Sequence, residues 1–299
     1  MKIIKHMDFI NPTESFVGKR RAIQGFGIYE KYAIILYHTG VCALYDLEAR
    51  APEPLDVIKL ASYNDGPDKR YINHANDVMF AGKLEDGRPL IYIQAGNSGE
   101  CDEYGFIACC EVEAVNIAPD ENGKMRITTE AVQTIYYKND GIENTKYQTP
   151  GWGWPSSLVD IEKGYYYLFS ARYRTKIDFI DKYDENNYIL TRFPLPEIGQ
   201  RYVTLTPNDI IEQFEPPFDI LFTQGGTLRD GIIYYTFGCG KPHYPNAMRI
   251  IDANEGKMLE RLDLSTCIFA EEEIECCAFY GDKLLVNTAG CRLYEIIRD

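Results

Sequence analysis

Short apolar runs alternate with turn residues along almost the whole chain. Runs rich in Val, Ile, Tyr and Phe, such as residues 165–169 and 284–287, are separated by clusters of Gly, Asn and Asp. Runs of this length and composition are typical of β-strands. A helix is indicated only after Thr206, where Pro207 follows a capping residue and the proline pair at 216–217 limits the helix to about two turns. The pattern therefore predicts an all-β protein.

One longer pattern recurs five times: a polar residue, an apolar residue four positions on, a tight turn, and a second β run. The five instances are residues 24–28 with 33–37, 76–80 with 90–94, 157–161 with 165–169, 224–228 with 232–236, and 275–279 with 284–288. Further strands follow within the units, at 40–46 and 55–60 in the first and at 248–252 and 259–263 in the fourth. Five units of four strands predict a five-bladed β-propeller, with residues 1–299 as a single domain.

The two ends of the chain are expected to complete one blade together. The fifth unit stops after its third strand, at 291–297, while the run at 2–9 belongs to no unit. We predict that this N-terminal strand pairs with the last blade and closes the ring, because closure removes two exposed sheet edges. An ordinary β-sandwich or two smaller β domains is the alternative that the pattern leaves open.

Loop lengths indicate which face of the ring carries the site. In each blade the start of the first strand and the end of the second lie on the same face. The long connections that fall on this face are 64–73, 139–154 and 206–219 before first strands, and 95–105 and 238–247 after second strands. Binding residues are concentrated in loops carried by a rigid scaffold, so we expect the ligand on this face, at the mouth of the central channel.

The strand register then places a mixed set of polar, charged and aromatic side chains at that mouth. The predicted ligand-binding residues are Arg21, Gln24, His38, His74, Asn76, Asp77, Asn97, Trp154, Ser157, Arg172, Gln224, His243 and Glu275. Such a set suits a small polar molecule, a glycan or a peptide; the alternative is that the inner-strand residues only hydrate the channel. Asp77 and Glu275 are the candidate acid and base of an enzyme. Because they lie in blades that are not neighbours, the ~5–5.5 Å separation of a retaining glycosidase is not expected.

Charge and cysteine content narrow the partners. The chain carries 31 Lys and Arg against 45 Asp and Glu, so its net charge is 31 − 45 = −14, which disfavours nucleic acid and membrane surfaces as partners. Nine cysteines without a C-x-x-C spacing argue against a disulfide framework and a zinc site, so we expect a reduced, cytoplasmic protein with no metal and no cofactor. The acidic run 271–273 is interpreted as a solvated loop. The sequence leaves open the oligomeric state and whether a leader preceded residue 1.

The fourth unit resembles a known family. Residues 222–226 read F-T-Q-G-G, residues 230–238 read D-G-I-I-Y-Y-T-F-G, and R-I-I-D and G-K-M-L follow at 249–252 and 256–259. This resembles the F-T-Q-G … D-G-x-L-Y-E-S-T-G … L-R-x-V-D … T-G-x-V-L blade of the propeller-type glutamine cyclotransferases, which convert N-terminal glutamine to pyroglutamate. The resemblance implies a five-bladed propeller and an amide-binding pocket near Gln224. Tyr235 stands where that family has an acidic residue.

Two functions follow as hypotheses. In the first, the protein is a binding propeller that recognises a small polar ligand at its loop-rich face. In the second, it is an enzyme acting in the same mouth, either cyclotransferase-like or glycosidase-like.

Overall fold

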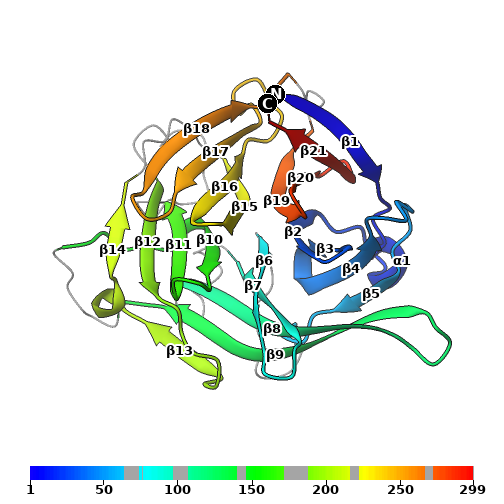
Figure 1. Ribbon diagram of the computed structural model, residues 1–299, viewed down its shortest axis with the longest axis horizontal. Coiled ribbons are helices and arrows are strands. Elements are labelled where there is room, and N and C mark those ends of the chain that lie inside the picture. The colour runs from blue at the N-terminus through cyan, green and yellow to red at the C-terminus, as the bar shows by residue number, and fades with distance from the viewer. Residues whose placement is uncertain are drawn as a thin grey trace.

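The computed structural model describes residues 1–63, 74–75, 77–96, 107–139, 146–171, 188–215, 222–266 and 272–298, and the statements below concern these residues. Their strands form five sheets arranged as blades around one axis (Figure 1). The all-β prediction and the five-bladed propeller are therefore confirmed. Within the described residues, no helix is long and apolar enough to cross a membrane.

Each blade is built from four antiparallel strands, with one addition in the second. Blade one contains β2 (Ile23–Tyr29), β3 (Tyr32–Tyr37), β4 (Val41–Asp46) and β5 (Asp56–Lys59). Blade two contains β6 (Val78–Lys83), β7 (Pro89–Gln94), β8 (Ala108–Pro119) and β9 (Met125–Tyr137), and β13 (Tyr202–Leu205) pairs in parallel with β9. Blade three contains β10 (Trp152–Asp160), β11 (Tyr165–Ala171), β12 (Tyr188–Pro194) and β14 (Glu212–Phe214). Blade four contains β15 (Thr223–Arg229), β16 (Ile232–Phe237), β17 (Ala247–Asp252) and β18 (Lys257–Asp263).

Blade five takes its strands from both ends of the chain, as predicted. It contains β19 (Ile274–Tyr280), β20 (Lys283–Thr288), β21 (Arg292–Ile297) and β1 (Lys2–Asp8). β1 runs antiparallel to β21, with Lys2 opposite Ile297 and Asp8 opposite Arg292. The two termini consequently lie side by side at the rim in Figure 1. This pairing closes the ring and leaves β1 as the outer strand of the blade.

The segment after β1 fastens blade five to blade one. The backbone N–H of Phe9 donates to the carbonyl of Cys291 at 2.9 Å, and the Phe9 ring lies 5.4 Å from that of Tyr45 in β4. The Tyr45 hydroxyl donates to the carbonyl of Ile10 at 2.6 Å. After this contact the chain forms the one-turn helix α1 (Thr13–Val17) and enters β2. Ring closure thus combines a strand pair with an aromatic contact between neighbouring blades.

Two connections differ from the sequence expectation. Thr206 and Asp209 do form a capping box, but the helix after them is a single 3₁₀ turn, Pro207–Asp209. The chain then extends into β14, which pairs with β12, so sheet pairing ends the helix before a second turn. The other difference is the length of the β8–β9 hairpin, which reaches under blade one in Figure 1. There Arg126 forms a salt bridge with Asp56 of β5, with 3.0 Å between Nη1 and Oδ1. The hairpin therefore covers the outer strand of blade one.

The inner strands approach one another so closely at the axis that two of them require glycine. A Cβ on Gly25 of β2 would lie 2.9 Å from the carbonyl carbon of Asp77, and a Cβ on Gly225 of β15 would lie 2.9 Å from the Asp77 Cβ. The Sγ of Cys276 in β19 would be nearer still to the Gly225 Cβ, at 2.7 Å. Blades one, two, four and five therefore meet around Asp77, and protein atoms fill the axis at this level.

We predict that the Phe9 ring contributes strongly to ring closure. Phe9 is 4% exposed, and removing a buried aromatic side chain costs about 3–5 kcal/mol. Phe9→Ala should lower the free energy of unfolding, measured by urea titration, by about that amount. Ile10→Ala is the matched control, because Ile10 is 49% exposed and its loss should cost no more than about 0.5 kcal/mol. Equal effects of the two variants would contradict the prediction.

Candidate functional site

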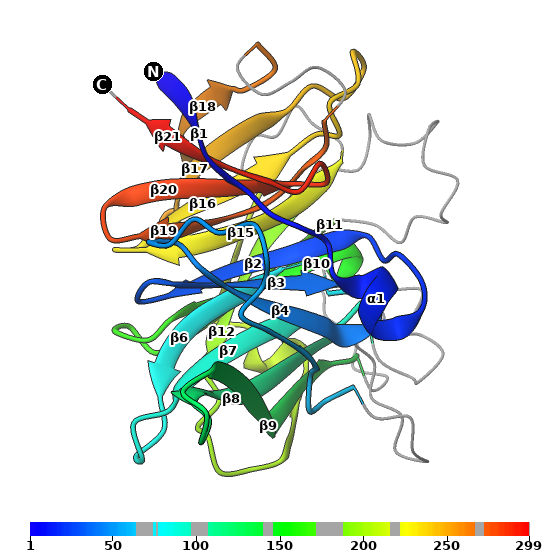
Figure 2. The same ribbon diagram turned by 90° about the vertical axis from the view of Figure 1, so that its right-hand side faces the viewer.

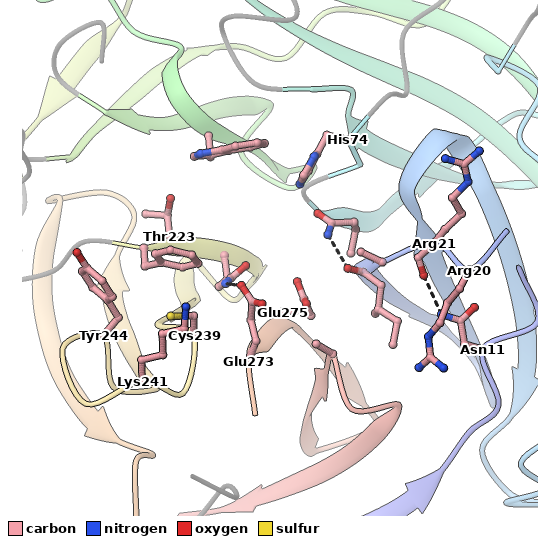
Figure 3. A pocket seen from close by; sticks show the side chains of 17 residues that line it. Asn11, Arg20, Arg21, His74, Thr223, Cys239, Lys241, Tyr244, Glu273 and Glu275 are labelled. Atoms are coloured by element: carbon pink, nitrogen blue, oxygen red, sulfur yellow. Dashed lines mark hydrogen bonds between the residues drawn. The ribbon is translucent and has the colours of Figure 1, made fainter. Parts of the chain in front are cut away.

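A cavity of about 580 Å³ opens on the face where the first strand of each blade begins and the second ends (Figure 3). Its walls come from all five blades. Residues preceding β2 and β6 contribute from blades one and two, and the start of β10 contributes from blade three. Blade four provides the start of β15 and the segment after β16, and blade five provides the start of β19 and the turn after β20. The cavity therefore lies above the level at which Asp77 fills the axis.

Two carboxylates from blade five form the acidic side of the cavity. Glu273 and Glu275 are two residues apart in extended chain, so both side chains point to the same side, while Ile274 between them joins the core of blades four and five. Glu275 is only 5% exposed. Burial, with the neighbouring charge of Glu273, raises its pKa well above the usual value. Burial also raises the pKa of Glu273. The pair therefore retains protons to higher pH than ordinary glutamates do.

Blade four supplies an amide and two aromatic rings beside these carboxylates. Gln224 donates from Nε2 to Glu273 Oε1 at 2.9 Å and to the carbonyl of Gly238 at 3.0 Å. The backbone of Phe222 has a positive φ of 90°, a conformation uncommon for an aromatic residue. Its ring lies 5.6 Å from that of Tyr244, and both residues line the cavity. Lys241, from the same segment as Tyr244, lies near Glu273 and opposes the rise in its pKa.

The opposite wall is formed by aromatic and cationic side chains of blades one to three. The rings of His74 and Trp154 lie 4.4 Å apart, and His38 lies 4.0 Å behind His74. Burial lowers the pKa of His74 to about 3, so its imidazole is neutral at physiological pH. Arg21 lines the cavity on the blade-one side and, being near His38, contributes to lowering the pKa of that histidine.

Six of the predicted site residues line this cavity, and four described ones do not. The lining residues are Arg21, Gln24, His74, Trp154, Gln224 and Glu275. Outside the lining are His38, which lies behind His74, His243, which is exposed, and Asp77 and Ser157, which are fully buried. Asn76, Asn97 and Arg172 lie outside the described residues, as does most of the connections 64–73 and 95–105.

Ser157 is buried, although the sequence repeat predicted it at the mouth. The prediction failed because the repeat in blade three was aligned in the wrong register. Four of the inner strands contain a register shift close to their start, between residues 23 and 26, 152 and 156, 223 and 226, and 274 and 277. Gln24, Gln224 and Glu275 lie within these irregular segments, and their counterpart in blade three is Trp154. Ser157 lies beyond the shift and hydrogen bonds Gln94 and Tyr166, both at 2.7 Å. Its placement at the mouth was therefore wrong.

Asp77 lies at the axis beneath the cavity, where no ligand in the cavity touches it. Burial raises its pKa to about 8, and the hydroxyl of Ser156 and nearby backbone amides offset part of that rise. Neither carboxylate oxygen meets the geometry of a full hydrogen bond with any described group. A protonated, fully buried Asp77 fits a packing position better than the catalytic position expected from the sequence.

Several residues that line the cavity were not predicted from the sequence. They are Asn11, Arg20, Ala22, Ile23, Phe222, Thr223, Cys239, Lys241, Tyr244, Glu273 and Ala289. Glu273 could have been predicted from the sequence, because a Glu-x-Glu spacing at the start of a strand places two carboxylates on the same side of it. The solvated-loop interpretation was also wrong for Glu272, which is buried and accepts hydrogen bonds from Arg292 at 2.8 Å and Tyr294 at 3.2 Å.

Fold and site together define a five-bladed propeller with a mixed polar and aromatic cavity at one end of its axis. No family model matches the chain, and no curated protein matches it. Among solved structures it is similar to the glutaminyl cyclase of Myxococcus xanthus, with a TM-score of 0.52 at 11% sequence identity over 99% of this chain and 94% of that one. The fold implied by the resemblance of blade four is therefore confirmed.

We predict that Asp77 makes the stability of the fold decline as pH rises. The native carboxyl keeps its proton up to about pH 8, whereas the unfolded chain releases it near pH 4. Because the native state binds more protons across this interval, stability falls from about pH 4 to about pH 8. Asp77→Asn removes this contribution. From pH 5 to pH 8 the unfolding free energy of the variant should therefore fall less than that of the wild type, and the difference between the two decreases should be on the order of 4 kcal/mol.

The measurement is urea unfolding at both pH values. Asp282→Asn is the matched control, because the Asp282 side chain is 99% exposed and should leave the pH dependence unchanged. A parallel decline in wild type and Asp77→Asn would contradict the prediction. Glu273 and Glu275 remain in the variant, so part of the decline is expected to persist.

Proposed function

We propose that the protein binds a small polar ligand, either a free small molecule, a sugar unit of a glycan or the end of a peptide, in the cavity at the mouth of the channel. The observation that carries this proposal is the cavity itself. Its volume of about 580 Å³ lies within the range of about 300–1,000 Å³ typical of ligand sites. All five blades contribute to its walls, so the scaffold holds the lining residues in a fixed arrangement.

The chemistry of the lining favours a ligand that combines a polar group with a flat or apolar part. The polar group would contact the carboxyl of Glu275 and the amide of Gln224, which both line the cavity and both lie next to Glu273. The apolar part would lie between the ring pair Phe222 and Tyr244 and the ring of Trp154. Aromatic walls around a few fixed polar groups are a common composition for such sites.

The two tryptophans of the chain provide a direct test. They are Trp152 and Trp154, and only the second lines the cavity. In a Trp152→Phe variant, the fluorescence of Trp154 should change saturably when a ligand from a set of amino acids, dipeptides, amines and monosaccharides enters the cavity. Ala289→Phe in that background should weaken binding at least about tenfold, because Ala289 lines the cavity and is exposed enough to accept a larger side chain.

Ala49→Phe, in an exposed turn of blade one, is the matched control and should leave the titration unchanged. If no compound of the set gives a saturable signal, the binding proposal fails. It also fails if Ala289→Phe binds every responding compound as tightly as its parent does.

A second candidate function, catalysis in the same cavity, is favoured by the carboxyl pair. Glu275 retains its proton to unusually high pH and Glu273 lies beside it, an arrangement in which one group can donate a proton and the other accept one. Because glutaminyl cyclase is among the solved structures with this fold, N-terminal glutaminyl peptides are the first substrates to assay. Aryl glycosides are the second.

If the protein is an enzyme, Glu275→Gln should lower turnover by at least about 100-fold while the melting temperature changes little. The rate on the active substrate should fall as pH rises through the pKa of Glu275, because the acid form is then lost. Turnover can be followed by chromatography of the peptide or by release of the aryl group. Full activity of Glu275→Gln, with the wild-type pH profile, would contradict a catalytic role for this residue.

A further inference from the structure

We propose that the bottom of the cavity is a receptor for a protonated primary amine, and that the amine displaces a proton from the Glu275 carboxyl when it binds. This inference rests on the proposed binding function and names the class of ligand. Its basis is the distribution of hydrogen-bond donors and acceptors around Glu275, together with the charges that surround it.

Glu275 is a deeply buried carboxyl, and the part of the chain that the structure describes provides no partner for it. It is 95% buried, yet it lines the cavity and its side chain points into the open space in Figure 3. Its backbone carbonyl accepts a hydrogen bond from the Thr236 hydroxyl at 3.0 Å, but no described group donates one to its side-chain carboxyl. A carboxylate buried in this way costs several kcal/mol unless a charge or donor compensates it. The position is therefore suited to a donor that arrives with the ligand.

The groups next to Glu275 add acceptors to the cavity. Both amide protons of Gln224 are already used, one on Glu273 and the other on the carbonyl of Gly238, so its Oε1 is the atom left to face a ligand. Gln24, on the blade-one side, donates its Nε2 to the carbonyl of Ile23 at 2.6 Å. The lining also contains Arg20, Arg21 and Lys241, but none of them donates a hydrogen bond to the Glu275 carboxyl. The inventory around this carboxyl is thus the carboxyl itself and an amide oxygen. An ammonium group, with three donors and no acceptor, is its complement.

Among the described residues, no cation forms an ion pair with Glu275. Glu273, just before the same strand, is the charged group that acts on it. From blade four, Lys241 acts on Glu273 instead, and from blade two, His74 is neutral because of burial. On the blade-one wall, Arg21 lies near His38 and Arg20 lies near Cys291. Asp77 lies below and retains its proton.

The proton balance follows from these placements. In this proposal Glu275 is a neutral carboxylic acid in the empty site, because burial and the neighbouring Glu273 raise its pKa and so disfavour its ionisation. When R–NH₃⁺ enters, the O–H bond of the carboxyl breaks, its proton goes to solvent, and the carboxylate accepts N–H donors from the ammonium. One cation enters and one proton leaves, so the charge of the site is unchanged. Binding should consequently strengthen with rising pH until the amine itself loses its proton.

The rings that line the cavity indicate what the amine should carry. Phe222 and Tyr244 form one aromatic surface and Trp154 with His74 forms another, and both are part of the same lining as Glu275. An amine attached to a flat apolar group can place its ring on these surfaces while its nitrogen reaches the carboxyl. A free arylalkylamine and the amino terminus of a peptide with an aromatic first residue share this chemistry.

Matched pairs of probes distinguish charge from shape. We suggest isothermal titration of the full chain with 2-phenylethylamine and with 2-phenylethanol, and, for the peptide source, with phenylalanyl-alanine amide and its N-acetyl derivative. Titrations at pH 7 in phosphate and in HEPES, which differ in ionisation enthalpy, give the number of protons exchanged. We expect each amine to bind at least about tenfold more tightly than its neutral analogue, with about one proton released. If 2-phenylethylamine binds more tightly than the peptide, the natural ligand is a free amine. If the peptide binds more tightly, it is the amino terminus of a peptide.

Three variants assign the effect to one carboxyl. Glu275→Gln should lose at least about tenfold in amine affinity and abolish proton release, with little effect on binding of the neutral analogues. Glu273→Gln should weaken amine binding less and retain proton release. Glu162→Gln, in an exposed turn of blade three, is the control and should match wild type. Melting temperatures establish that each variant is folded.

Equal affinity for amines and neutral analogues, or amine binding without proton release, would overturn the inference. So would a folded Glu275→Gln variant that binds amines as wild type does. If a sugar or another neutral compound binds in a manner blocked by Ala289→Phe while the amines do not bind, the amine inference fails and the binding function stands. If no compound binds at all, both fail.

Discussion

The crowding of inner strands at the propeller axis is the constraint on which the rest of the structure depends. Glycines at positions 25 and 225 are needed because any side chain there would collide with the backbone or Cβ of Asp77 or with Cys276. Since protein atoms fill the axis at this level, the channel cannot serve as an open tube through the ring. The space left for a ligand lies above this level, where the inner strands begin and diverge.

The start of the inner strands is also where the sheets are irregular, and that irregularity shapes the site. Four of the five blades have a register shift within the first few residues of the inner strand. An irregular segment of this kind turns a side chain away from the alternation of a regular strand. Gln24, Trp154, Gln224 and Glu275 all lie in such segments and all line the cavity. The irregular start of the inner strand therefore supplies at least one lining residue in each of these four blades.

This irregularity explains how far sequence reasoning could go. Strand positions, blade number and ring closure depend on hydrophobic runs and turn residues, which are local features, and they were predictable. The site depends on register within a few residues. The sequence alignment placed Ser157 at the mouth, three positions beyond Trp154, in a blade whose register shift is one residue longer than in the other three. Contacts between distant segments were also beyond local patterns. The Phe222–Tyr244 wall and the pairing of Gln224 with Glu273 arise only when separate strands and loops fold together.

Two adjacent residues, Glu272 and Glu273, link the blade that closes the ring to the acidic side of the cavity. Glu272 and Glu273 are adjacent, so their side chains point in opposite directions from the extended chain. Glu273 enters the cavity, whereas Glu272 turns into blade five and accepts hydrogen bonds from Thr288, Arg292 and Tyr294.

Arg292 also lies 3.6 Å from Asp8 at the end of the N-terminal strand. The carboxylates at the bottom of the cavity are thus held by the blade that the two ends of the chain complete. Glu275 lies in β19, which pairs with β20, and β20 pairs with β21, the strand that β1 joins to close the ring. Ring closure by β1 therefore completes the same blade whose inner strand presents Glu275 to the cavity.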